Sequence, residues 1–322
     1  MKKYFQRPAI KILVLILAVL GICLLYLSYK TYGNWAFALE LRGKKLLAFV
    51  FVGIAAAFST ISFQTMTQNH FLTPNILGLD SLYVFVQTLL FFFLGGQQLL
   101  GKDSMGTFFL NVLLMVIAGF SLAKLLLKRS GNDLFLLLMI GIILGTFFNS
   151  ISTFLQVVMD PNEYDLLQGK LFASFGNVNS QYLIIAGLGI VGLALFLWVQ
   201  SPALDVLHLG NDQAVNLGIN VSSFQTILLI VISALVGLST SLVGPVTFLG
   251  FIVANMSYQF MGTYRHRDLF IGGSLLAILL LVLGQFLVEQ IFQLNTTLSI
   301  VIEFGGGIYF VGKIISERKQ RT

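Results

Sequence analysis

Long apolar runs separated by short polar connections cover almost the whole chain. A helix needs about 20 mainly apolar residues to cross the hydrocarbon core of a bilayer. By that measure the pattern predicts ten membrane-spanning helices, of which the third and eighth are interrupted by glycine and polar residues. The predicted spans are residues 10–28, 46–67, 80–96, 106–127, 134–157, 182–200, 223–242, 246–262, 269–291 and 299–315.

The composition supports a lipid-embedded protein. Of the 322 residues, 57% are hydrophobic and only 10% are charged, whereas about 25% are charged in an ordinary soluble domain. We therefore expect an all-α polytopic membrane protein that forms one domain over residues 1–322. The Val52-Gly53 and Val236-Gly237 stretches hint at two weakly related halves of five spans each.

The first apolar run resembles a signal peptide but favours a retained helix. Residues 10–28 are longer than a typical signal-peptide core, and no small-residue cleavage site follows them. The single cysteine, Cys23, lies inside this run, so the sequence offers neither a disulfide framework nor a thiolate metal cluster.

Basic residues set the expected orientation. With ten spans both termini lie on one side, and the 19 lysines and arginines divide 13 to 6 in favour of that side. Cytoplasmic loops carry the excess of Lys and Arg in membrane proteins. Both termini and the connection at 203–222 are therefore predicted to be cytoplasmic.

Motifs for enzymatic chemistry are missing. There is no GxxxxGK[ST] loop, no HExxH, no paired cysteines and no cluster of histidines, so we expect no catalytic residues and no metal site. Two carboxylates, Asp80 and Glu303, fall at or within predicted spans, where ionisable residues are functional candidates. A proton-coupled mechanism usually needs a relay of several such groups, and the spans show none.

The stretch Asp205–Asn220 is a polar, turn-rich island between two apolar runs. Gln213–Leu217 is predicted to form a short helix with Asp212 as its N-cap, and Gly218 occupies the following position, where left-handed geometry suits glycine. A short helix at a membrane face is expected to contact a partner.

Several ordered motifs resemble the permease subunits of type II ABC importers, the FecCD-like family that imports ferric siderophores, haem and cobalamin. Leu41–Lys45 is similar to the family's Arg-Leu-Pro-Arg stretch, with Gly43-Lys44 in place of Leu-Pro. Asn69–Gly78 is similar to its Asn-Pro-Leu-Ala-x-Pro…Leu-Gly segment. Leu209–Gly218 resembles the cytoplasmic coupling segment, and Gly244–Phe251 resembles the Gly-Pro-Ile-x-Phe-x-Gly-Leu signature.

One further part of the chain departs from the family pattern, and another resembles a particular branch of the family. Gln285–Gln290 lies where many relatives have Asp-x-x-x-Arg, which puts a third external arginine contact in doubt. Thr296–Phe310 resembles a branch linked to catecholate-type siderophores such as petrobactin and enterobactin.

The resemblance implies a subunit of an ATP-driven importer in the bacterial cytoplasmic membrane, moving a ferric siderophore. Its partners would be two cytoplasmic ATPases, a second permease chain (identical or paralogous) and an extracytoplasmic siderophore-binding protein or lipoprotein, with no nucleic acid. No cofactor is expected on this chain, because ATP and Mg²⁺ would be held by the ATPases and the iron is already chelated by the siderophore.

The resemblance also implies roles for individual residues. Coupling to the ATPases is expected within segment 205–220, at His208, Leu209, Gly210, Asp212, Gln213, Ala214, Leu217 and Gly218. The binding protein is expected to dock on Arg42 and Lys45, for which interfacial anchoring is the alternative. The translocation path is expected to be lined by Thr60, Gln64, Asn149, Ser150, Ser152, Gly244, Pro245 and Phe248.

A different class of transporter remains open at this point. A secondary transporter or channel for a small solute would also use broken helices near the membrane midplane. Its transport would collapse with the ion gradient and persist without nucleotide, which distinguishes it from an ATP-driven importer.

Overall fold

Every regular element that the computed structural model describes is a helix. The described residues are 8–29, 35–96, 105–129, 134–176, 180–294 and 296–321. In chain order the elements are α1 (Pro8–Ser28), α2 (Trp35–Thr67), the 3₁₀ turn η1 (Pro74–Leu77), α3 (Leu79–Leu94), α5 (Met105–Arg129), α6 (Leu134–Val158), α7 (Pro161–Leu171), α8 (Ser180–Val199), α9 (Ser201–Leu207), α10 (Asn211–Asn216), α11 (Val221–Val243), α12 (Leu249–Met261), α13 (His266–Gln290) and α14 (Leu298–Arg321).

Each of the ten predicted spans coincides with one of these helices. Seven helices in the described ranges are long and apolar enough to cross a membrane, namely α1, α2, α5, α6, α8, α11 and α13. Of the others, α3 has 16 residues and α12 has 13, and at 1.5 Å per residue α12 rises only about 20 Å. The all-helical polytopic fold is confirmed, while the count of ten spans stays a prediction.

The helix α2 is longer than the apolar pattern predicts. It starts at Trp35, whereas the predicted span starts at residue 46, and it runs for 33 residues. The basic cluster from Arg42 to Lys45 therefore lies inside the helix. Lysine and arginine are good helix formers, and two of these side chains find partners on neighbouring helices. This explains why the helix begins before the apolar run does.

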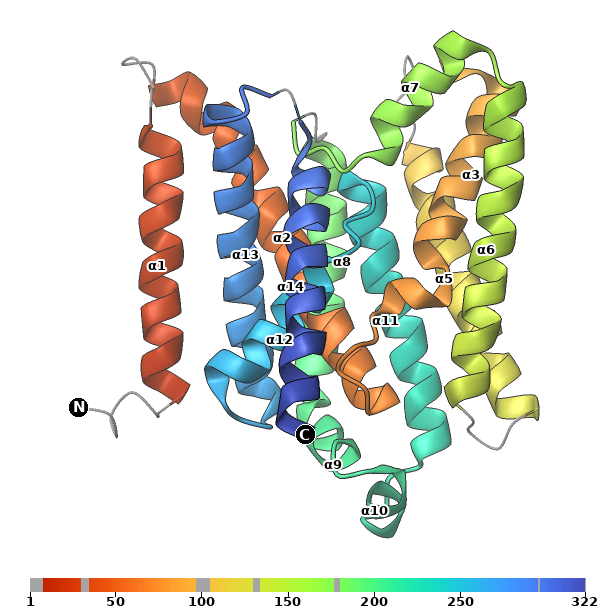
Figure 1. Cartoon of the computed structure of the whole chain (residues 1–322), viewed down its shortest axis with the longest axis vertical. Coiled ribbons are helices and arrows are strands. Elements are labelled where there is room, and N and C mark those ends of the chain that lie inside the picture. Colours follow the sequence, from red (N-terminus) through yellow and green to blue (C-terminus); the bar gives the residue numbers. More distant parts are fainter. Residues whose placement is uncertain are drawn as a thin grey trace.

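The two ends of the molecule differ in what they carry. The described start of α1, the end of α14 and the short helices α9 and α10 lie at one end, and α7 lies at the other (Figure 1). This arrangement puts the first and last described residues on the same side as segment 205–220. We refer to that end as the inner end and to the opposite one as the outer end.

The contact between α2 and α13 lies at the centre of the fold. A Cβ atom added at Gly53 of α2 would lie 3.1 Å from Ala277 Cβ of α13, and one added at Gly273 would lie 3.2 Å from Ala57 Cβ. Small residues let membrane helices approach closely, so that van der Waals packing replaces the hydrophobic driving force that lipid removes. The residues around this contact belong to one buried cluster that also includes side chains of α11 and α12.

Replacing Gly53 by valine should test this close packing. The added side chain would be forced against Ala277 and Ile278, and overpacking of this kind costs about 1–3 kcal/mol. Gly21→Val is the matched control, because Gly21 lies in α1 with no atom within 4 Å of an added Cβ. Thermal unfolding in detergent should show a lower midpoint for Gly53→Val alone. Equal midpoints for the two variants would contradict the packing described here.

Candidate functional site

The stretch Asp205–Asn220 contains the end of the short helix α9 and the whole of α10, at the inner end of the molecule (Figure 1). The helix α10 ends as predicted, because Gly218 adopts a positive φ of 86°. The Gly218 N–H donates to Val215 O, and the Ile219 N–H donates to Ala214 O. This pair of hydrogen bonds is a Schellman motif, which satisfies the last carbonyls of the helix.

The predicted start of this helix is wrong by two residues. The helix begins at Asn211 rather than Gln213, and Gly210 takes the N-cap position in place of Asp212, without a side-chain cap hydrogen bond. Gly210 has a φ of 114°, a conformation that glycine adopts at no steric cost. The turn before the helix is therefore set by Gly210, and Asp212 lies within the first turn with its side chain exposed.

Apolar side chains at this tip face outward. Leu209 is 62% exposed, Val215 59% and Leu217 62%, whereas Ala214 is fully buried. Leu209 and Leu217 were both predicted as contact residues, and Val215 was not. Ala214, which is also a predicted contact residue, is buried where α10 packs against the rest of the protein, and its coupling role stays a prediction. Gln213 is exposed, and His208 and Gly210 are partly buried.

The helix α9 is attached to the body of the protein through the buried His266. The backbone N–H of His266 donates to Asp205 Oδ1 at 2.7 Å, and the ring Nδ1 lies 2.6 Å from the same oxygen. The ring Nε2 lies 2.7 Å from Thr65 Oγ1 of α2. Because an ionised carboxylate only accepts, Nδ1 carries a proton, and Nε2 shares a hydrogen bond with the Thr65 hydroxyl, which can donate or accept.

The ionised state of Asp205 is favoured by these contacts. Burial raises the pKa of its carboxyl, but the hydrogen bonds and charge of His266 outweigh that effect, so the pKa lies below the ordinary value. Burial and the proximity of His266 also lower the pKa of the neighbouring His208, and for a histidine a lower pKa favours the uncharged ring. Sequence reasoning missed His266 and Thr65, because they lie 61 residues after and 140 residues before Asp205, respectively.

Three histidines meet near this attachment without forming a metal site. The ring centres of His70 and His208 are 6.2 Å apart, and those of His208 and His266 are 6.1 Å apart. No group of three or more His, Cys, Asp or Glu side chains within the described residues is arranged to hold a metal ion.

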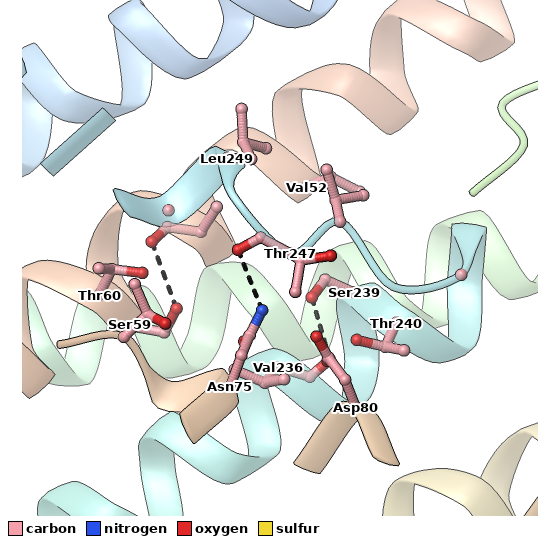
Figure 2. Close-up of a pocket in the computed structure, with 15 residues that line it drawn as sticks. Val52, Ser59, Thr60, Asn75, Asp80, Val236, Ser239, Thr240, Thr247 and Leu249 are labelled. Atoms are coloured by element: carbon pink, nitrogen blue, oxygen red, sulfur yellow. Dashed lines mark hydrogen bonds between the residues drawn. The ribbon is translucent and has the colours of Figure 1, made fainter. Parts of the chain in front are cut away.

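Part of the predicted translocation path lines a small polar cavity between α2, α3 and α11. The cavity has a volume of about 40 Å³, enough for a few water molecules. Figure 2 shows Thr60 and Ser59 of α2 on one side and Ser239, Thr240 and Asp80 on the other. Gly244 and the following residues Val246 and Thr247 also contribute to its wall.

The other predicted path residues do not line this cavity. Asn149 and Ser150 are exposed on α6, and the buried Ser152 donates to Phe148 O of its own helix at 2.7 Å. Gln64 is fully buried, and its Nε2 donates at 2.7 Å to His70 O in the loop that follows α2. Pro245 and Phe248 are partly buried, and Phe248 packs against Gly306 of α14.

The two intramembrane carboxylates are close to the same cavity. Asp80 lines it, and its Oδ2 atom is buried without a hydrogen-bond partner among the described residues. Glu303 is exposed on α14 and accepts a hydrogen bond from Thr247 Oγ1 at 3.0 Å. Apart from Thr60, this hydroxyl-rich wall was not found from the sequence, because its side chains come singly or in adjacent pairs from four separate segments.

At the outer end, Arg42 binds the end of α1. Its Nη1 donates to Tyr26 O at 2.8 Å, to Leu27 O at 3.2 Å and to Tyr29 O at 2.7 Å. These carbonyls lie in the last turn of α1 and just beyond it, where a cation is favoured by the helix dipole. The docking role of Arg42 stays a prediction, and in this structure its guanidinium is held by α1.

Lys45 forms an ion pair with α13. Its Nζ lies 2.8 Å from Glu289 Oε1, and the two side chains are only 11% and 12% exposed. Gln285 and Tyr26 donate to the same oxygen at 2.8 and 2.9 Å. We call Lys45 and Glu289 the outer ion pair. The positive charge of Lys45 is thus neutralised by a carboxylate of the same chain. Its docking role stays a prediction.

Comparisons with known proteins point in one direction. The FecCD transport family matches residues 9–316. The petrobactin import system permease protein YclO of Bacillus subtilis (strain 168) is 42% identical over 315 residues, which cover 98% of this chain and 99% of the relative. The petrobactin import system permease protein FatC of Bacillus anthracis is 35% identical over 273 residues, which cover 85% of this chain and 77% of the relative.

A solved structure shares the fold. It is described as an inward-facing conformation of a metal-chelate type ABC transporter, and it superposes with a TM-score of 0.83 at 21% sequence identity. The match covers 96% of this chain and 99% of that chain. At this level of identity the likeness concerns the fold alone.

Breaking the outer ion pair should destabilise the protein strongly. Removing one partner of a buried pair leaves an uncompensated charge, at a cost of about 3 kcal/mol or more, so Lys45→Gln should lower the unfolding midpoint in detergent. The double variant Lys45→Gln/Glu289→Gln should recover much of the loss. Lys44→Gln is the control, because Lys44 and Glu40 are well exposed and 3.5 Å apart, and such a pair contributes about 0.5 kcal/mol or less. Equal effects at 44 and 45 would contradict the buried pair.

Proposed function

The chain belongs to the FecCD transport family, and we propose that it is the permease subunit of an ATP-driven importer that moves a ferric siderophore across the bacterial cytoplasmic membrane. The observation that carries the proposal is the 42% identity to a petrobactin import permease over nearly the full length of both chains. The substrate class we favour is therefore petrobactin or a related iron chelate. Iron enters this scheme as cargo, already bound by the siderophore.

The exposed tip of α9–α10 supports a partner at the inner end. Leu209, Val215 and Leu217 expose more than half of their apolar side chains on a segment that projects beyond the membrane-spanning helices (Figure 1). Apolar groups in water favour burial against another protein. Two cytoplasmic ATPase subunits fit this position, and they supply the ATP and Mg²⁺ chemistry that this chain does not perform.

Other faces leave room for the remaining partners. Phe304 and Ile308 of α14 are 72% and 61% exposed, and Phe147 and Phe154 of α6 are 56% and 67% exposed. These apolar surfaces suit lipid or a second permease chain, identical or paralogous. An extracytoplasmic siderophore-binding protein docks at the outer end, near Arg42 and Lys45.

The proposed topology follows from charge and from the described fold. Ten spans with both termini cytoplasmic place 13 of the 19 basic residues on the inner side, in line with the excess of Lys and Arg in cytoplasmic loops. The common location of the start of α1, the end of α14 and α9–α10 supports this topology (Figure 1).

Transport by this scheme is a change of access driven by the ATPases. ATP binds the two conformations of the ATPase pair with different affinity, and only that difference shifts the equilibrium. Movement of the ATPases displaces α9–α10, and the spanning helices then open the path to one face or the other. The residues expected to line the path are uncharged, and several, such as Thr60, are polar, which lets a large complex pass without deep binding.

Reconstitution would test the proposed function. The protein purified from native membrane should carry a P-loop ATPase and a second permease chain, and proteoliposomes of this complex with its binding protein should take up iron-loaded petrobactin only with ATP on the ATPase side. Dissipating ion gradients with an ionophore should leave uptake unchanged. Uptake that persists without nucleotide and stops with the ionophore would instead identify a secondary transporter.

Charged substitutions on the exposed tip should weaken binding of the ATPase. Val215→Asp/Leu217→Asp places two carboxylates in the apolar contact, and we expect about a tenfold lower yield of copurified ATPase, since buried contact residues dominate interface energies. The unfolding midpoint of the permease should not change, because both side chains are exposed. Ile291→Asp, at a residue 63% exposed at the outer end, is the control. An unchanged yield would show that this tip does not bind the ATPase.

A further inference from the structure

Polar contacts tie both ends of α9 to the first turn of α13. Near the C-terminal end of α9, the Asp205 carboxylate accepts from the backbone and ring of His266. At its N-terminal end, Ser201 Oγ accepts from Arg267 Nε at 3.1 Å. Ser201 is 1% exposed and His266 is 0% exposed. A displacement of α9 therefore breaks these contacts or carries the start of α13 with it.

The ring of His266 extends the attachment to a third helix. Both of its nitrogens are engaged, Nδ1 by Asp205 and Nε2 by Thr65 of α2, at 2.6 and 2.7 Å. We call Asp205, His266 and Thr65 the inner bridge. Because the ring and Thr65 are buried, water does not replace these contacts, and breaking one leaves a buried polar group unpaired.

Beyond Thr65, α2 leads directly to the polar cavity. Thr60 lies five residues earlier in the same helix, which is about 7.5 Å along its axis. Gly250 of α12 packs against the Thr60 side chain, and both residues line the cavity. A shift of the inner end of α2 thus reaches the cavity wall through a continuous helix.

The helix α10 has a weaker attachment. Its hydrogen bond to the spanning helices runs from Gln225 Nε2 to Asn211 Oδ1 at 3.4 Å, and Leu209, Val215 and Leu217 around it are exposed. The two short helices therefore differ in what they contact: α10 presents a surface to a partner, and α9 is fixed to the helices that surround the path.

We propose that the inner bridge transmits the displacement of α9–α10 to α2 and α13, with Asp205, His266 and Thr65 as positioning residues of the transport cycle. This inference rests on the proposed function. It specifies which contacts inside the permease convert movement at the ATPase surface into movement of the helices beside the cavity.

A purely structural role would require fewer contacts. Asp205 could act simply as a cap for α13, since it accepts from the His266 backbone N–H at the start of that helix. A cap of this kind uses the carboxylate and the backbone N–H, and it does not need the His266 ring or Thr65. Thr65→Val therefore separates the two roles, because it removes the bond to α2 and leaves the cap in place.

The experiment compares Thr65→Val with Thr67→Val in the reconstituted complex. Thr67 lies in the same turn of α2, and its hydroxyl donates to Phe63 O of its own helix at 2.8 Å, so the control loses a hydroxyl without losing a contact between helices. The measured quantity is iron-loaded petrobactin taken up per ATP hydrolysed. Unfolding midpoint and copurified ATPase are recorded for each variant.

We expect Thr65→Val to reduce uptake per ATP about fivefold, the factor that the loss of one hydrogen bond gives in an equilibrium. ATP hydrolysis and ATPase yield should stay close to wild type, and the unfolding midpoint should fall, because the buried His266 Nε2 loses its partner. Thr67→Val should match wild type in all four. Asp205→Ala should lower the same ratio, and adding Thr65→Val to it should cause no further loss, because both changes interrupt one connection.

Three results would overturn the inference. They are an unchanged ratio in Thr65→Val, a loss equal to that of Thr67→Val, and losses that add fully in the double variant. A wild-type complex without ATP-dependent uptake would instead refute the proposed function, so the two failures are distinguishable.

Discussion

The pairing of α2 with α13 is the contact on which the rest of the structure depends. The outer ion pair joins the two helices near one face of the molecule, and the bond between Thr65 and His266 joins them near the other. Between these points, Gly53 and Gly273 let the two backbones approach closely. In lipid, where apolar surfaces gain little by meeting each other, close packing and internal hydrogen bonds must supply the stability. The pair combines both over most of its length.

The positions of the spanning helices could be read from the sequence because bilayer thickness imposes one length on every crossing. The prediction was least accurate where a helix continues beyond the lipid or stops short of it. Helix α2 extends outward through Arg42 and Lys45, since their side chains find carbonyls of α1 and the carboxylate of Glu289. Helix α12 is short because the Gly244–Phe248 stretch occupies part of its predicted crossing. The first effect has no signal in hydropathy, whereas the glycine and polar residues that interrupt the eighth predicted span are visible in the sequence.

At the candidate site, local geometry was more predictable than contacts. Gly218 ends α10 as its position predicts, because left-handed backbone strongly favours glycine. Which face of so short a helix is buried depends on the neighbouring helices, and here Ala214 points inward while Val215 points outward. The attachment through His266 joins residues separated by 61 and 201 positions, and a single chain without aligned relatives contains no information on such pairs.

The partners of Arg42 and Lys45 become available at different times as the chain is made. The carbonyls that Arg42 binds belong to Tyr26, Leu27 and Tyr29, which are synthesised only 13 to 16 residues before it. Glu289 comes 244 residues after Lys45. The hairpin of α1 and α2 therefore forms its own cationic contact early, whereas Lys45 stays an unpaired charge until α13 inserts. The outer ion pair can therefore form only when nearly the whole chain has been inserted.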